Sequence, residues 1–171
     1  SKGDINMGAG VAETTLGYTE AGAAGISVLT DTLFFGGFPE DLKIAREKNP
    51  ETPLLRKDFM VDEYQIYEAK AWGADVILLI AANLESEEIK NLSTKAHELG
   101  LEVLLEVHDK DEIEKSPMEC VDIVGVNNRN LKNFAENNVN ASLDLYQYLP
   151  KDKALISESC ISQTETVKQL K

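Results

Sequence analysis

The chain is short of the residues that build disulfide frameworks and metal centres. It contains two cysteines, Cys120 and Cys160, and two histidines among its 171 residues. Two isolated cysteines provide neither a disulfide framework nor the paired spacing of a metal site, and two histidines without a cluster of acidic ligands do not suggest one either. We therefore predict no metal, and we expect a reducing, cytoplasmic location.

Long apolar runs and an excess of positive charge are also missing. The longest apolar run, VILLIAA at 76–82, is far too short to cross a bilayer, and the opening SKGDINMGAG lacks the apolar core of a signal peptide. The formal net charge of −13 argues against nucleic acid and membrane surfaces as main partners. The net charge does not exclude an anionic small molecule as a ligand, because positive charge inside a binding site can outweigh the electrostatic field of the whole protein.

The chain does contain alternating strand and helix patterns. Its length and its hydrophobic fraction of 43% suit a single domain over 1–171. Continuous apolar runs predict strands within 20–30, 53–58, 71–82, 98–108, 121–128 and 154–159. Helical spacing predicts helices over 40–49, 62–72 and 86–99, with Ile44 and Leu99 among their apolar positions. Gly22, Gly73 and Gly100 stand where helices end in a left-handed residue.

Alternating strands and helices indicate parallel βαβ units, which two architectures contain. A doubly wound sheet usually shows a glycine-rich phosphate turn after its first strand. The string GAGVAE at 8–13 has Glu13 in place of the third glycine and follows no strand. The other architecture, a (β/α)8 barrel, collects functional side chains at the carboxyl ends of successive strands. We predict an α/β fold of this barrel type.

Polar side chains follow four successive predicted strands at the same end. They are Lys57, then Glu106 and His108, then Asn127, Asn128 and Arg129, then Glu158 and Ser159. In a barrel these ends line one mouth. Residues two apart on a strand share a face, so we expect Glu106 beside His108 and Asn127 on the same face as Arg129. The pattern predicts acid–base chemistry on an anionic, partly aromatic small molecule, with Lys57 donating and Glu106 accepting a proton.

These residues also have structural interpretations. Lys57 can form a strand-end ion pair with Asp58, and Arg129 can cap a loop. Cys160 has no base partner in the sequence and is interpreted as structural. A carboxylate inside the apolar run LLEVH, in contrast, is costly unless it is paired, which favours a functional role for Glu106.

Longer strings carry a family resemblance. The chain resembles the indole-3-glycerol phosphate synthases in the order and spacing of SKG, ISVLTDTLFFGG, LLRKDFMVDEYQIYEAKAWGADVILLIAA, HELGLEVLLEVHD, VGVNNRNLKNF and ISES. The resemblance implies a barrel without metal or organic cofactor. It also implies a phosphorylated small-molecule substrate, 1-(2-carboxyphenylamino)-1-deoxyribulose 5-phosphate. Its ring would close with loss of carbon dioxide and water, a reaction of tryptophan biosynthesis.

The same resemblance implies a role for each matching site residue. Lys57 matches the general acid that protonates the ketone oxygen, and Glu106 matches the general base of the dehydration. Substrate-orienting residues of the family match Asn127, Arg129 and Glu158. Apolar walls around the aromatic ring match Phe35, Phe59 and Leu78. One side of the phosphate cradle matches Ser159 and the backbone of Cys160, where the family usually has glycine.

The resemblance further implies a chain truncated at both ends. The start falls after strand one of the family barrel and VKQLK lies in the helix after strand seven, so we expect strands 2 to 7. Such an incomplete barrel would expose two sheet edges, which favour self-association. Two hypotheses follow: a synthase that carries most of its active site, or a non-catalytic fragment that needs itself or a complementary piece. A third, a sugar-phosphate isomerase barrel, does not explain RKDF and EVH together.

Overall fold

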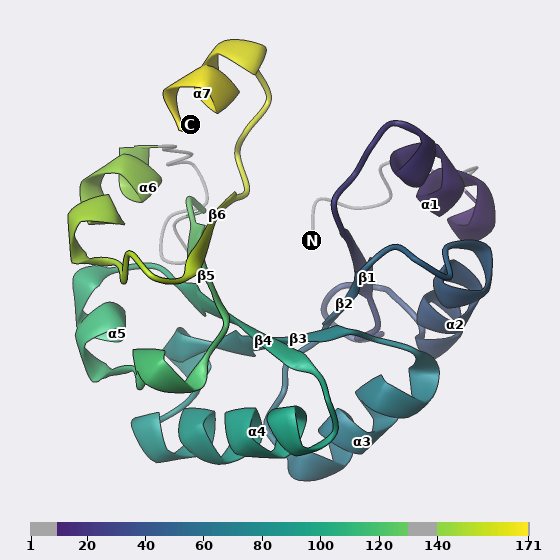
Figure 1. Ribbon diagram of the computed structural model, residues 1–171, viewed down its shortest axis with the longest axis horizontal. Helices are drawn as coiled ribbons and strands as arrows, with labels where there is room; N and C mark the ends of the chain where they lie inside the picture. The colour runs from purple at the N-terminus through teal and green to yellow at the C-terminus, as the bar shows by residue number, and fades with distance from the viewer. Residues whose placement is uncertain (1–9, 130–139, 171) are drawn as a thin grey trace. The chain divides into compact units, whose positions relative to one another are not determined.

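The computed structural model describes residues 10–129 and 140–170, which divide into two compact units. Unit 1 contains residues 10–78 and 95–102, and unit 2 contains residues 79–94, 103–129 and 140–170. Each unit consists of parallel strands connected by helices (Figure 1). The α/β class predicted from the sequence is confirmed, while a single domain over 1–171 stays a prediction.

Unit 1 begins with alternating helices and strands. They are α1 (Val11–Glu20), β1 (Ile26–Leu29), α2 (Pro39–Lys48), β2 (Leu54–Lys57), α3 (Glu63–Trp72) and the first part of β3 (Val76–Ile80). Strand β2 pairs in parallel with both β1 and β3. The guanidinium of Arg56 lies 4.2 Å from the centre of the Trp72 ring on α3. Because side chains alternate along a strand, Lys57 projects to the face opposite Arg56.

Unit 2 continues the same alternation. After α4 (Ser86–Glu98), which crosses the division, come β4 (Glu102–Val107), α5 (Lys110–Lys115), β5 (Ile123–Asn127), α6 (Asn140–Leu145), β6 (Ala154–Glu158) and α7 (Thr164–Gln169). Short 3-10 turns occupy Ala81–Asn83, Met118–Cys120 and Tyr146–Tyr148. Strand β5 pairs in parallel with β4 and β6, opposing Glu106 to Gly125 and Asn127 to Glu158. Opposed residues project to the same side of a sheet, so these four share one face.

The predicted strands and helices are largely confirmed, but two residues counted among the apolar positions of the helices are not buried. All six predicted strands are present, and Gly22, Gly73 and Gly100 have φ angles of 85°, 92° and 68°. Ile44 is 37% exposed, because the buried stripe of α2 runs through Leu42 and Ala45 and leaves it turned outward. Leu99 is only half-buried, because α4 ends one residue before it.

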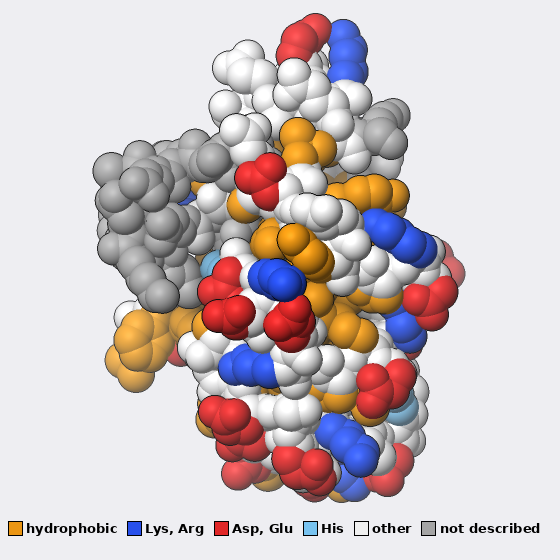
Figure 2. All heavy atoms as spheres, turned by 90° about the vertical axis from the view of Figure 1, so that its left-hand side faces the viewer, with side chains coloured by type: hydrophobic (Ala, Val, Ile, Leu, Met, Phe, Trp, Pro, Cys, Tyr) orange, Lys and Arg blue, Asp and Glu red, His pale blue; other side chains and the backbone are white. Residues whose placement is uncertain are grey.

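The described surface carries both signs of charge. Figure 2 shows Asp and Glu side chains spread widely over one face, with Lys and Arg side chains among them. Within residues 10–129 and 140–170, the helices are too short or too polar to cross a membrane.

Candidate functional site

The lysine cluster of unit 1 consists of Lys57, Phe35, Phe59 and Leu78. Phe35 and Phe59 stack with ring centroids 4.9 Å apart and 9° between their planes, and the Lys57 Nζ lies 5.7 Å from the Phe35 centroid. The β2–β3 register places Leu78, which is fully buried, on the same face as Lys57. An ammonium thus lies next to a flat apolar wall, an arrangement that suits an aromatic ligand with an oxygen to protonate.

Local hydrogen bonds hold the two phenylalanines in place. The Asp31 carboxylate accepts hydrogen bonds from the backbone N–H groups of Phe34 and Phe35, at 2.6 and 3.0 Å. After β2, the Gln65 amide donates to the Phe59 carbonyl at 2.9 Å while its oxygen completes the capping box of α3 with Asp62. Both rings are therefore positioned by short-range contacts that do not depend on a ligand.

Asp58 serves a structural network in which Arg56 is its ionic partner. Its carboxylate lies 2.9 Å from Arg56 and accepts a 2.7 Å hydrogen bond from Thr30. Arg56 also pairs with Glu68 at 3.2 Å, and both Arg56 and Asp58 are buried. Charged groups this deeply buried need such partners. Arg56 is therefore one ionic partner of Asp58, and it pairs on the side of the helices with Glu68 of α3.

The carboxylate face of unit 2 consists of Glu106, Asn127 and Glu158. Glu106 is only 4% exposed, and Asn127 Nδ2 donates to its Oε1 at 3.0 Å. Parallel pairing of β5 with β6 brings Glu158 beside Asn127. The predicted proximity of these three residues is confirmed. A buried carboxylate held by a fixed amide donor can accept a proton from a bound molecule.

Gly125 leaves room for the second carboxylate on this face. A Cβ built at Gly125 would lie 1.9 Å from Oε1 of Glu158 and 3.3 Å from Cδ2 of Leu104. No real pair of atoms approaches that closely, so any other residue at 125 would displace the Glu158 side chain. The glycine thereby determines where this carboxylate lies.

His108 contacts the carboxylate face from the end of β4. Its Nε2 lies 3.3 Å from Oε1 of Glu106, and its Nδ1 lies 3.2 Å from Oε2 of Glu112 on α5. Burial alone lowers the pKa of His108, but the hydrogen bonds and charges of Glu106 and Glu112 outweigh burial and raise this pKa to about 9. The predicted contact of His108 with Glu106 is confirmed, whereas nothing in the sequence pattern pointed to Glu112.

The turn after β6 contains two residues with left-handed backbone. Ser159 and Cys160 have φ angles of 65° and 61°. The buried Asn128 side chain reaches this turn and donates to the carbonyl oxygens of Glu158 and Ser159, at 2.8 and 3.4 Å. Asn128, which the sequence pattern placed at the predicted mouth without a role of its own, thus holds the turn. Arg129 is exposed, and its backbone N–H donates to Oδ1 of Asn127 at 3.0 Å.

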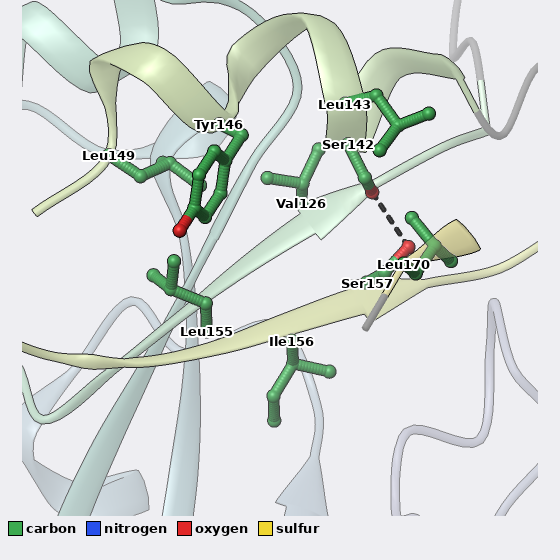
Figure 3. A pocket seen from close by; sticks show the side chains of 9 residues that line it. All are labelled: Val126, Ser142, Leu143, Tyr146, Leu149, Leu155, Ile156, Ser157 and Leu170. Atoms are coloured by element: carbon green, nitrogen blue, oxygen red, sulfur yellow. Dashed lines mark hydrogen bonds between the residues drawn. The ribbon is translucent and has the colours of Figure 1, made fainter. Parts of the chain in front are cut away.

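A small pocket lies apart from these residues, between strands β5 and β6 and the segment 142–149. Its volume is about 100 Å³, and Val126, Leu143, Tyr146 and Leu155 are among its lining (Figure 3). Ser142 and Ser157 hydrogen-bond at 2.7 Å at its edge. None of the predicted site residues lines it. The lysine cluster lies in unit 1 and the carboxylate face lies in unit 2, and each is defined by contacts within its own unit.

Comparison with known sequences identifies one family. The family model described as "Indole-3-glycerol phosphate synthase" matches residues 1–171. Proteins of that name from Bacteroides thetaiotaomicron, Neisseria meningitidis and Legionella pneumophila are 47%, 49% and 44% identical to the chain, over 100%, 95% and 98% of it. The chain spans 65%, 61% and 64% of the length of these relatives.

Comparison with solved structures shows likeness of fold alone. The structure of KGPDC from Streptococcus mutans has a TM-score of 0.66 at 14% identity, and the match covers 93% of this chain and 76% of that one. The structure of the citrate synthase SbnG has a TM-score of 0.68 at 10% identity, with coverages of 92% and 76%. Together with the family match, these likenesses confirm the predicted fold class, a partial (β/α)8 barrel.

Proposed function

Because this chain belongs to the indole-3-glycerol phosphate synthase family, we propose that it carries the acid–base residues of that ring-closing reaction. The substrate would be 1-(2-carboxyphenylamino)-1-deoxyribulose 5-phosphate, and the products indole-3-glycerol phosphate, carbon dioxide and water. The observation that carries the proposal is the family match over all 171 residues. The contacts within each unit support the individual roles.

The ring-closing half of the reaction is assigned to the lysine cluster. The stacked Phe35 and Phe59 rings offer a flat surface for the anthranilate ring, and the Lys57 ammonium lies beside that surface. As the aromatic carbon attacks the ketone, negative charge grows on the ketone oxygen, and Lys57 donates a proton to it. Carbon dioxide then leaves and restores the aromatic electron count.

The dehydration half is assigned to the carboxylate face. Glu106 is buried and its Oε1 accepts from Asn127, so its position and orientation are set before a substrate arrives. As general base it accepts a proton from the ring CH2 group next to the nitrogen, while the hydroxyl formed from the ketone takes up a proton from solvent and leaves as water, so that the ring double bond forms. Arg129 and Glu158 orient the substrate, and the Ser159–Cys160 turn holds one side of the phosphate.

Partners and location follow from the same proposal. The partner is a phosphorylated small molecule, with no cofactor, no nucleic acid and no membrane. Neither Cys120 nor Cys160 forms a disulfide within residues 10–129 and 140–170, which suits a cytoplasmic location. Self-association through sheet edges is the prediction of the alternative hypothesis, a non-catalytic fragment.

Direct turnover tests the proposal. We would incubate the purified 171-residue chain with the substrate and follow indole fluorescence, alongside a completed barrel in which the remaining segments of the B. thetaiotaomicron relative flank this chain. We expect turnover in the completed barrel at least. Turnover in neither protein would overturn the proposal, and turnover in the completed barrel alone would favour the fragment hypothesis for the isolated chain.

Gly125→Ala should weaken substrate binding in the completed barrel. The new methyl group displaces the Glu158 carboxylate from its place beside Asn127, and losing one charged contact costs about 1.4 kcal/mol, or tenfold in Kd. Titration of substrate into the variant measures the effect. Val124→Ala is the control: it shortens a buried side chain on the opposite face, so it should lower stability and leave Kd unchanged. An unchanged Kd in Gly125→Ala contradicts the role of Glu158.

Cys160→Gly should strengthen phosphate binding and stabilise the fold. A left-handed backbone costs an ordinary residue about 1–2 kcal/mol, while glycine loses about 0.5–1 kcal/mol through backbone entropy. The net gain is about 0–1.5 kcal/mol, and removal of Cβ also clears the anion's approach. Urea unfolding and inorganic phosphate titration measure the two effects. Cys120→Gly, at a position without positive φ, should destabilise instead. Lower stability or weaker phosphate binding in Cys160→Gly contradicts this account.

A further inference from the structure

His108 connects two carboxylates that belong to different elements. Its Nε2 faces Oε1 of Glu106 on β4 at 3.3 Å, and its Nδ1 faces Oε2 of Glu112 on α5 at 3.2 Å. All three side chains are largely buried, with exposed fractions of 12% for His108, 5% for Glu106 and 14% for Glu112. In such surroundings charged contacts are screened only weakly by solvent.

Glu112 is itself firmly held. Its Oε2 also accepts a 2.8 Å hydrogen bond from the backbone N–H of His108. Its own backbone N–H donates to Oδ1 of Asp109, the N-cap of α5, at 2.9 Å. His108 therefore contacts the Glu112 carboxylate through both its backbone N–H and its ring Nδ1. This arrangement leaves the ring Nε2 directed at Glu106.

Two groups approach one oxygen of Glu106, one as a hydrogen-bond donor and the other as an ion-pair partner. Asn127 Nδ2 approaches Oε1 from β5 and His108 Nε2 approaches the same atom from the end of β4. Contacts from two directions restrict rotation of the carboxylate about its Cγ–Cδ bond. A general base needs such a defined orientation, because proton transfer requires alignment with the substrate.

We propose that His108 is a positioning residue that bridges Glu106 to Glu112 and so holds the Glu106 carboxylate ionised and in one orientation. This inference rests on the proposed function, in which Glu106 is the general base. Glu106 and Glu112 are the charged groups that act on His108, and they keep it an imidazolium at neutral pH, with its pKa raised to about 9. Neither His108 nor Glu112 needs to touch the substrate for this role.

Steady-state kinetics of the completed barrel test whether His108 positions Glu106. We expect His108→Leu to lower kcat by about 10–100-fold, the usual loss when a group that orients an active-site residue is removed, with KM changed far less. His108→Gln keeps a donor near the Nε2 position and should recover most of kcat. Both variants should move the acid limb of the pH–rate profile about one unit upward, because a carboxylate that loses a neighbouring cation binds a proton more readily.

Glu112→Gln should show the same upward shift of the acid limb in weaker form, since it removes the group that holds His108 charged. The control is Glu114→Gln, on the same helix, where the carboxylate is 61% exposed and pairs with Lys110. That variant should leave kcat and the pH profile unchanged. A His108→Leu variant with unchanged kcat and an unmoved acid limb overturns the proposal.

A second measurement does not depend on turnover. Because the chain has only two histidines, a His97→Gln background leaves the imidazole of His108 as the sole histidine signal of this chain in nitrogen-15 NMR. We expect it to titrate near pH 9, and we expect Glu112→Gln and Glu106→Gln each to lower that midpoint by about one unit. A midpoint below about pH 7.5, or one that Glu112→Gln does not move, overturns the bridge. The expected titration in a completed barrel without turnover supports the bridge and overturns the proposed function instead.

Discussion

Glu106→Gln lowers kcat of the completed barrel by about 10²–10⁴-fold, the range expected when a general base is lost. The substitution keeps the shape of the side chain, and an amide oxygen still accepts the hydrogen bond that Asn127 donates to Oε1. The fold should therefore persist, and substrate binding should change little. What disappears is the ability to take a proton, which affects the transition state and hence kcat.

Steady-state indole fluorescence and urea unfolding measure the two sides of this prediction. The matched control is Glu102→Gln at the start of the same strand, where the glutamate is exposed; it should keep full turnover. Turnover of Glu106→Gln within about threefold of the parent, a difference of less than about 1 kcal/mol in the activation free energy, would remove Glu106 from the role of general base.

Lys57→Ala should be as damaging, again by about 10²–10⁴-fold in kcat, because the ketone oxygen loses its proton donor. Lys57 is half-buried at the end of β2 and packs beside Phe35. Lys57→Met, which retains most of the apolar stem, should be equally inactive while disturbing the aromatic pair less. Equal losses in the two variants would show that the ammonium, rather than the packing of the stem, is required.

Adding a small primary amine to the Lys57→Ala variant is a further test of the same role. We expect it to restore part of kcat in proportion to its ammonium concentration, because it can occupy the space that the side chain vacates. Lys43→Ala is the control: Lys43 is another lysine near an aromatic ring, 5.7 Å from the Trp72 centroid, but it lies on α2 with its side chain 49% exposed. It should leave turnover unchanged. Retained turnover in Lys57→Ala would contradict its role as general acid.

Some contacts of the aromatic and carboxylate residues could be predicted from the sequence pattern, and others could not. Alternation along LLEVH and the sharing of a face by residues two apart predicted the contact between Glu106 and His108, which is confirmed at 3.3 Å. The same rule predicted that Asn127 and Arg129 share a face. However, β5 ends at Asn127, and side chains no longer alternate regularly beyond the end of a strand. For Phe35 and Phe59, the sequence showed two apolar residues in separate loops, whereas their 4.9 Å stack depends on how both loops fold.

By itself the sequence determined the elements and the family. Apolar runs, helical spacing and glycines at helix ends are local features, and each acts through the backbone within a few residues. Family identity was indicated by strings such as RKDF and EVH, and the family model matches all 171 residues.

Only the tertiary structure decided which residues meet across strands. The register that opposes Glu106 to Gly125 and Asn127 to Glu158 arises from packing between elements far apart in the chain. The anchoring of His108 by Glu112, the clearance that Gly125 leaves for Glu158 and the hold of Asn128 on the turn after β6 follow from that packing. Such contacts depend on the relative placement of whole strands and helices, which no local pattern specifies.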